Sequence, residues 1–115
     1  MPPDMTPDQI AEIAARQPPF ARLLGLRITH ASPDRVEAEV PVVEALTNRN
    51  GQLHGGALMA VADNLGGTAT FLNLQPGQGT VTVESKTNFF RPVAPGEVLR
   101  AVTEPLHIGR KTQVW

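Results

Sequence analysis

A single long helical pattern, with strand patterns on both sides of it, limits the possible folds of this chain most strongly. Apolar side chains recur at spacings of three and four between residues 56 and 72, as on one face of an α-helix: Leu58, Val61, Ala62, Leu65, Ala69 and Leu72. Residues 36–42 before it, and residues 80–91 after it, instead alternate apolar and polar side chains, which is the period of a half-buried strand. This order predicts an α+β fold in which an antiparallel sheet packs around one long central helix.

Shorter signals predict the remaining elements. Thr6 as a cap, Pro7 at the first helical position and Gln9 three residues after the cap predict a helix over residues 7–16. A short helix is expected over residues 20–24, closing on Gly25. An extended segment over 26–30 and a turn at 32–34 predict a hairpin with the strand over 36–42. The other expected elements are a loop over 44–56 and strands over 98–104, from about 107, and from 110 to the end.

Composition narrows the class of protein and of partner. The chain has 115 residues, 41% of them apolar and 18% charged, which predicts one soluble domain over residues 1–115. A net charge of -1 favours neither nucleic acid nor membrane as a partner. The absence of cysteine removes thiolate catalysis and Cys-ligated zinc, and His30, His54 and His107 lack metal-ligand spacing, so no metal is expected. Without an apolar run of ~20 residues or a signal-peptide pattern, we expect a cytoplasmic protein.

Residues 48–63 concentrate the polar and glycine residues that could carry chemistry. Gly55 and Gly56 open the long helix, where backbone N–H groups lack intrahelical partners and can bind an anion or a developing oxyanion. Asp63 lies two turns further on, on a helix face that otherwise carries small residues. A carboxylate and an oxyanion donor are the components needed to hydrolyse an acyl group without a Ser or Cys nucleophile.

Each of these residues also has an ordinary structural interpretation. Asp63 alone could be a solvated helix carboxylate, and the two glycines could form only a tight turn. His54 could be a loop or cap donor and Asn48 a turn former. Their joint spacing, rather than any single residue, favours a functional site.

The same residues resemble a known family. Asn48-Arg49-Asn50-Gly51-Gln52-Leu53-His54-Gly55-Gly56, followed by Asp63, is similar to the hotdog-fold acyl-CoA thioesterases of the phenylacetate-degradation (PaaI-like) type. The similarity extends from about Phe20 onward and includes Thr82-Val83-Glu84, Asn88-Phe89-Phe90-Arg91-Pro92 and Gly109-Arg110-Lys111.

This resemblance implies both a fold and an activity. It implies a sheet wrapped around the long helix and hydrolysis of a small aryl- or medium-chain acyl-CoA, with no cofactor other than the CoA of the substrate. It also implies a homodimer, sometimes a dimer of dimers, with active sites at the dimer interface. Similar proteins run one or two strands beyond Trp115, so the resemblance implies that a C-terminal strand or strands are missing.

The resemblance also implies residue roles. Asp63 would activate water or attack the thioester carbonyl, and the Gly55 N–H of the other chain would polarise that carbonyl with help from Asn48. His54 would hold the loop, and Thr82 would stand near the attacking water. The remaining residues, expected to contact substrate or CoA, are Gly56, Arg91, Arg110 and Lys111.

Two other functions remain open from the residues. A hotdog hydratase or dehydratase of enoyl or hydroxyacyl thioesters would need a catalytic His beside the acid, and His54 could supply it. A non-catalytic acyl-CoA-binding module would keep the fold without turnover, although it has no need for a carboxylate near a polyanionic ligand.

Overall fold

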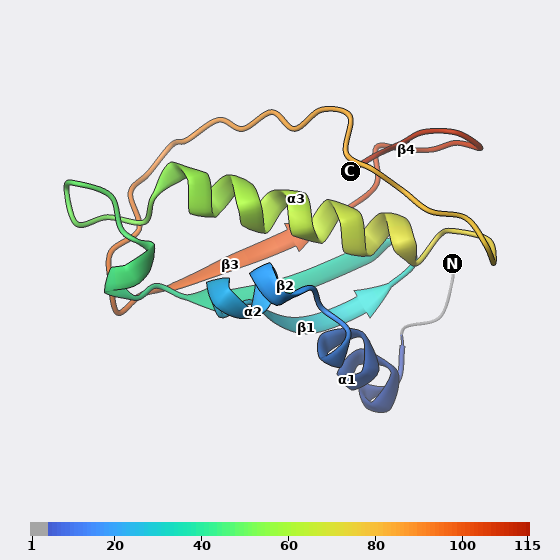
Figure 1. Ribbon diagram of the computed structural model, residues 1–115, viewed down its shortest axis with the longest axis horizontal. Helices are drawn as coiled ribbons and strands as arrows, with labels where there is room; N and C mark the ends of the chain where they lie inside the picture. The colour runs from blue at the N-terminus through green and yellow to red at the C-terminus, as the bar shows by residue number, and fades with distance from the viewer. Residues whose placement is uncertain (1–4) are drawn as a thin grey trace.

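A three-stranded antiparallel sheet packs against one face of a long helix in the computed structural model, which describes residues 5–115 (Figure 1). The elements in chain order are α1 (Pro7–Ala15), α2 (Pro19–Leu24), β1 (Arg27–Ser32), β2 (Arg35–Pro41), the 3-10 turn η1 (Glu44–Leu46), α3 (Gly55–Phe71), β3 (Val98–Thr103), β4 (His107–Ile108) and β5 (Gln113–Val114). Strands β1, β2 and β3 form the sheet in that order, and β4 and β5 form a separate hairpin. The structure is therefore α+β, as predicted.

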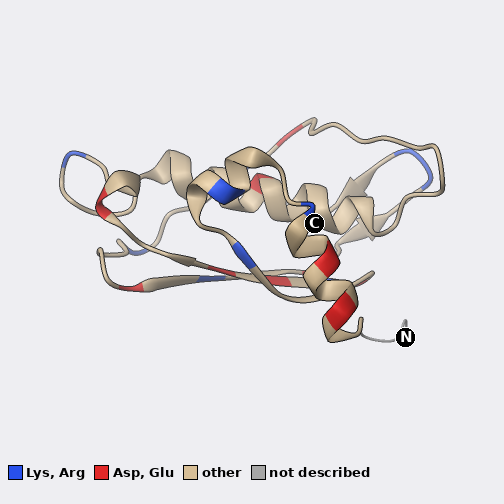
Figure 2. Cartoon of the chain, turned by 60° about the horizontal axis from the view of Figure 1, so that its bottom comes forward, with Lys and Arg blue, Asp and Glu red and all other residues tan. Residues whose placement is uncertain are grey.

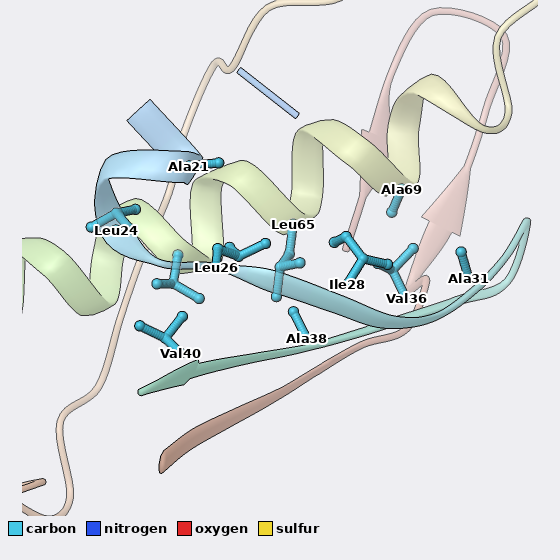
Figure 3. Close-up of a cluster of buried hydrophobic side chains, with 11 residues drawn as sticks. Ala21, Leu24, Leu26, Ile28, Ala31, Val36, Ala38, Val40, Leu65 and Ala69 are labelled. Atoms are coloured by element: carbon cyan, nitrogen blue, oxygen red, sulfur yellow. The ribbon is translucent and has the colours of Figure 1, made fainter. Parts of the chain in front are cut away.

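The core lies between the sheet and α3. Along β2, Val36, Ala38 and Val40 are buried while the residues between them are half-buried, which is the alternation that a strand with one covered face requires. Leu65 and Ala69 of α3 point toward these side chains (Figure 3). Because helix and strand patterns each present one apolar face, their contact removes both faces from water.

Leu65 is 1% exposed and lies at the centre of this core, so its truncation should be costly. We expect Leu65→Ala to lower the free energy of unfolding by about 2–5 kcal/mol, because it removes buried methyl groups and leaves a cavity. Urea unfolding followed by circular dichroism measures the loss. Leu23→Ala is the matched control, since Leu23 is 76% exposed and should change stability by less than about 0.5 kcal/mol. Equal losses in the two variants would contradict this placement of the core.

The strands of the sheet carry both basic and acidic residues (Figure 2). Glu39 lies between Arg27 and Arg100, with N to O distances of 3.5 Å to each. Arg35 forms ion pairs with Glu37 and Glu104, and its hydrogen bond to Glu37 is the main reason that its pKa is raised. These ion pairs, in which Glu37 and Glu39 are half-buried, lie on the face of the sheet opposite the core.

The helices and the first hairpin agree with the predictions. Thr6 caps α1 in a capping box, in which its hydroxyl accepts from the Gln9 N–H and the Gln9 side chain accepts from the Thr6 N–H. Gly25 ends α2 with a φ of 73°, a left-handed conformation that glycine adopts at little cost. The long helix α3 begins one residue earlier than predicted. Within residues 5–115, no helix is long and apolar enough to cross a membrane.

The predicted strand over residues 80–91 is wrong for this structure. The segment is extended but joins no β-ladder, and it runs along α3 on the side away from the sheet (Figure 1). Val83 and Phe90 are each 91% exposed. Alternation of side chains predicts an extended backbone, but a strand also requires a hydrogen-bonded neighbour, which this segment lacks among the described residues.

The predicted strand from residue 110 is also wrong at its start. Residues 109–112 form a turn, in which the Gly109 N–H donates to the Thr112 carbonyl over 2.9 Å. The strand expected from about 107 is the two-residue β4, and only Gln113–Val114 continues as a strand after the turn. Residues 110–112, which the pattern had assigned to a strand, therefore lie in a tight turn.

Candidate functional site

The loop before α3 is built around Asn48. Its side-chain Oδ1 accepts from the N–H groups of Asn50 at 2.9 Å and Gln52 at 3.1 Å, and Gly51 adopts a φ of 75°. An isolated bridge between Thr47 and Leu53 closes the loop. In this chain Asn48 therefore shapes the loop that leads into α3.

His54 connects this loop to the start of α3. Its Nδ1 accepts from the Gly56 N–H at 2.8 Å, and its own N–H donates to the Leu46 carbonyl at 2.8 Å. An accepting Nδ1 requires the tautomer that carries its proton on Nε2. His54 thus caps the helix and holds the loop.

The two glycine amides at the helix start differ. The Gly56 N–H is engaged by His54, whereas the Gly55 N–H has no hydrogen-bond acceptor among residues 5–115. The ring of Phe89 lies over Gly55, so closely that a Cβ added there would stand 3.3 Å from it. A small residue and an unpaired donor therefore coincide at the first position of α3.

Asp63 faces away from the sheet and contacts the extended segment. The Thr82 hydroxyl donates to Asp63 Oδ1 over 2.6 Å, and both residues are exposed. Together with Phe89 at Gly55, this contact shows that the segment runs antiparallel to α3 along its outer side. The structure thus brings Asp63 and Thr82 of one chain into contact.

Within one chain, Asp63 and Gly55 do not meet. They are eight residues apart on one helix, which corresponds to about 12 Å along its axis. A carboxylate and an oxyanion donor that act on one carbonyl must both lie within a few ångströms of it. The chain therefore carries two separate candidate half-sites, one at Asp63 and Thr82 and one at Gly55, Asn48 and His54.

The basic residues are exposed and lie in two places. Arg91 is two residues before Val93, whose carbonyl accepts from the Leu53 N–H next to the helix start. Arg110 and Lys111 lie in the turn between β4 and β5, and both border the groove that contains Asp63. Among the described residues, no group of three acidic, His or Cys side chains could hold a metal ion.

An open groove surrounds Asp63. Its floor is the outward face of α3, and its walls are α1, residues 79–86 and the β4–β5 hairpin. Gly66, Gly67 and Thr70 form part of the floor beside Asp63. Small side chains next to an exposed carboxylate leave room for a ligand or for another backbone.

Comparison with known proteins places the chain in a family. The model of the Thioesterase superfamily matches residues 50–115. Proofreading thioesterase EntH of Cronobacter turicensis is 40% identical over 92 residues, which are 80% of this chain and 66% of that protein, just under two thirds of its length.

Solved structures agree with this assignment. A mutant of thioesterase PA1618 from Pseudomonas aeruginosa superposes with a TM-score of 0.84 at 31% identity, over 95% of this chain and 78% of the other. The PaaI protein of E. coli, from the phenylacetic acid degradation operon, shares the fold with a TM-score of 0.78 at 24% identity, over 91% of this chain and 74% of its own. The chain belongs to the thioesterase superfamily and has the hotdog fold, so the predicted family is confirmed.

Two features of the site were not predicted. The ring of Phe89 lies against Gly55, and Phe89 is 54% exposed. Gln17 is buried and bonded to α3 next to Asp63. Neither carries a local sequence signal, because each contact joins residues more than thirty positions apart.

Proposed function

We propose that this chain is a subunit of an acyl-CoA thioesterase that hydrolyses a small aryl- or medium-chain acyl-CoA. The observation that carries the proposal is the Asp63 carboxylate, oriented by the Thr82 hydroxyl at 2.6 Å and exposed in the groove over α3. Membership of the thioesterase superfamily, and the name of the EntH relative, support the reaction class.

The chemistry follows from the two half-sites. The Gly55 N–H binds the thioester oxygen as negative charge develops on it. Asp63 removes a proton from water as the water oxygen bonds to the carbonyl carbon, or it attacks that carbon itself. The C–S bond then breaks, and CoA leaves as a thiolate that needs little help from an acid. Where Asp63 itself attacks, water then hydrolyses the mixed anhydride, which releases the carboxylic acid and regenerates the Asp63 carboxylate. Asn48 and His54 hold the loop that presents Gly55.

A homodimer, possibly a dimer of dimers, is part of this proposal. The distance of about 12 Å along α3 between Asp63 and Gly55 supports a complete site in which each residue comes from a different chain. The extended segment 80–91 adds support, because its exposed valines and unpaired backbone could pack against and hydrogen-bond to a second chain.

The remaining assignments concern CoA. Arg91, Arg110 and Lys111 are exposed cations at the two ends of α3 and would contact CoA phosphates. Gly56 contributes to the substrate side of the helix start, with its N–H held by His54. The proposed reaction uses no metal or cofactor, and a cytoplasmic location suits an acyl-CoA substrate.

Thiol release from a panel of aryl- and aliphatic acyl-CoAs tests the proposal. We expect release of CoA from at least one member of the panel. Hydration of an enoyl-CoA without thiol release would favour the hydratase, although the Nδ1 of His54 is occupied as a helix cap. Binding of acyl-CoA without turnover of either kind would favour the non-catalytic module.

Thr82 offers a sharper test of how Asp63 is oriented. We expect Thr82→Val to lower kcat by about 10- to 100-fold, because it removes a hydrogen bond to a charged group while keeping the side-chain shape. Thr82→Ser keeps the hydroxyl and should stay within about threefold of the wild type. Steady-state thiol release measures both variants, and an equal loss in the two would disprove a role for the hydroxyl.

A further inference from the structure

Gln17 is a buried amide at the junction between α1 and α2. It lies two residues after the end of α1, precedes Pro18, and is 8% exposed. Its Oε1 accepts from Asn64 Nδ2 over 2.7 Å, and its Nε2 donates to the Ile13 carbonyl over 3.3 Å. The side chain thus joins the end of α1 to the middle of α3, at the residue that follows Asp63.

Thr68 completes the cluster. Its hydroxyl donates to the Asn64 carbonyl over 2.9 Å, so it is able to accept from Gln17 Nε2 over 3.3 Å. Both amide hydrogens of Gln17 and its oxygen therefore have partners. Leaving any of these groups buried without a partner would be costly, so the cluster strongly favours one geometry.

The cluster supplies the hydrogen bonds between α3 and the segment that contains α1, whereas α1 itself packs against β1. No residue of α1 is fully buried, although Ile10 and Ile13 pack on the edge of the core. Within residues 5–115, every hydrogen bond that joins the segment before β1 to α3 involves Gln17. α1 also borders the groove that contains Asp63, through residues that include Gln9, Glu12 and Ile13.

We propose that Gln17 is a positioning residue, which fixes α1 as a wall of the groove and thereby limits the size of the acyl group that the site accepts. This inference rests on the proposed thioesterase function. Asn64 and Thr68 are one helical turn apart, on the flank of α3 between the core face and the Asp63 face. Because this flank adjoins Asp63, α1 held there would restrict the space for a bulky acyl group beside the Asp63 carboxylate.

The first test measures the tether without substrate. Gln17→Met keeps the volume of the side chain and removes all of its hydrogen bonds. We expect amide hydrogen exchange in residues 8–15 to rise by about tenfold, with exchange in β2 and β3 unchanged. Unchanged exchange in α1 would overturn the tether, whatever the activity of the protein.

The second test measures acyl preference. The ratio of kcat/KM for a bulky aryl acyl-CoA to that for a short aliphatic one should rise about tenfold in Gln17→Met. Gln75→Met is the matched control, because Gln75 borders the same groove but is exposed, and its ratio should not change. An unchanged ratio in Gln17→Met would reject the role in specificity. If the wild type releases no thiol, the proposed function is wrong, but the role of Gln17 can still be tested. The ratio of Kd values for the same two acyl-CoAs then replaces the ratio of kcat/KM.

Discussion

Replacing Asp63 by Asn should lower kcat for acyl-CoA hydrolysis by ~10²–10⁴, as expected for the loss of a catalytic base or nucleophile. The amide oxygen of Asn can still accept from the Thr82 hydroxyl, so the contact between α3 and the extended segment is retained. The exposed position of Asp63 makes a folding defect from this change small. Thiol release at saturating substrate, with circular dichroism to confirm folding, measures the effect.

The matched control for this change is Asp8→Asn. Asp8 is also an exposed helix carboxylate, in the first turn of α1, and it should leave kcat unchanged. If Asp63→Asn retained activity within tenfold of the wild type, the carboxylate would not be the catalytic group. The catalytic group would then have to be sought at the other half-site, around Gly55.

The second large effect is expected at Gly55. Gly55→Pro removes the backbone N–H, and we expect kcat to fall by ~10²–10³, the usual effect of losing one oxyanion donor. The helix should tolerate proline, because Gly55 is its first residue and His54 before it already has a ψ of 133°, which suits a residue before proline. This position therefore allows the donor to be removed without breaking the helix.

Gly55→Ala distinguishes the effect of losing the N–H donor from the effect of adding a side chain. Both variants place a Cβ 3.3 Å from the Phe89 ring, but alanine keeps the N–H. We expect Gly55→Ala to stay within about tenfold of the wild type, because a shift of Phe89 is its main cost. Equal losses in the alanine and proline variants would assign the effect to crowding by Phe89 rather than to the donor.

Mixing the two inactive variants tests whether the site is shared between chains. In a symmetric dimer, Asp63→Asn and Gly55→Pro subunits that exchange randomly would form intact sites at about a quarter of all positions. We therefore expect activity to return to about that fraction of the wild type after mixing. If each complete site lay within one chain, mixing would restore nothing.

Much of the fold could be predicted from local patterns. The three- and four-residue spacing of Val61, Leu65 and Ala69 predicted α3, and the alternation in β2 predicted a strand with one buried face. Capping chemistry at Thr6 and Gln9 located α1 to within one residue at its end. These signals act over a few residues, so tertiary contacts are not needed to recognise them.

The site was predictable in its parts but not in its assembly. The His54-Gly55-Gly56 and Asp63 spacing indicated an oxyanion donor and a carboxylate on one helix. It could not show that His54 occupies the Gly56 amide, or that Phe89 covers Gly55. Nor could a local pattern show the contact between Thr82 and Asp63, because nineteen residues separate the two positions.

The amino-acid sequence by itself determined the long helix, the first hairpin, the family, and the residues available for chemistry, because each depends on short-range periodicity or on a local motif. Tertiary structure alone decided that residues 80–91 extend along α3 without a ladder, that residues 109–112 turn, and that Gln17 bonds to Asn64. The physical reason is that pairing, burial and hydrogen bonding depend on which distant segments become neighbours. Local propensity sets the conformation of a segment but does not choose its partner.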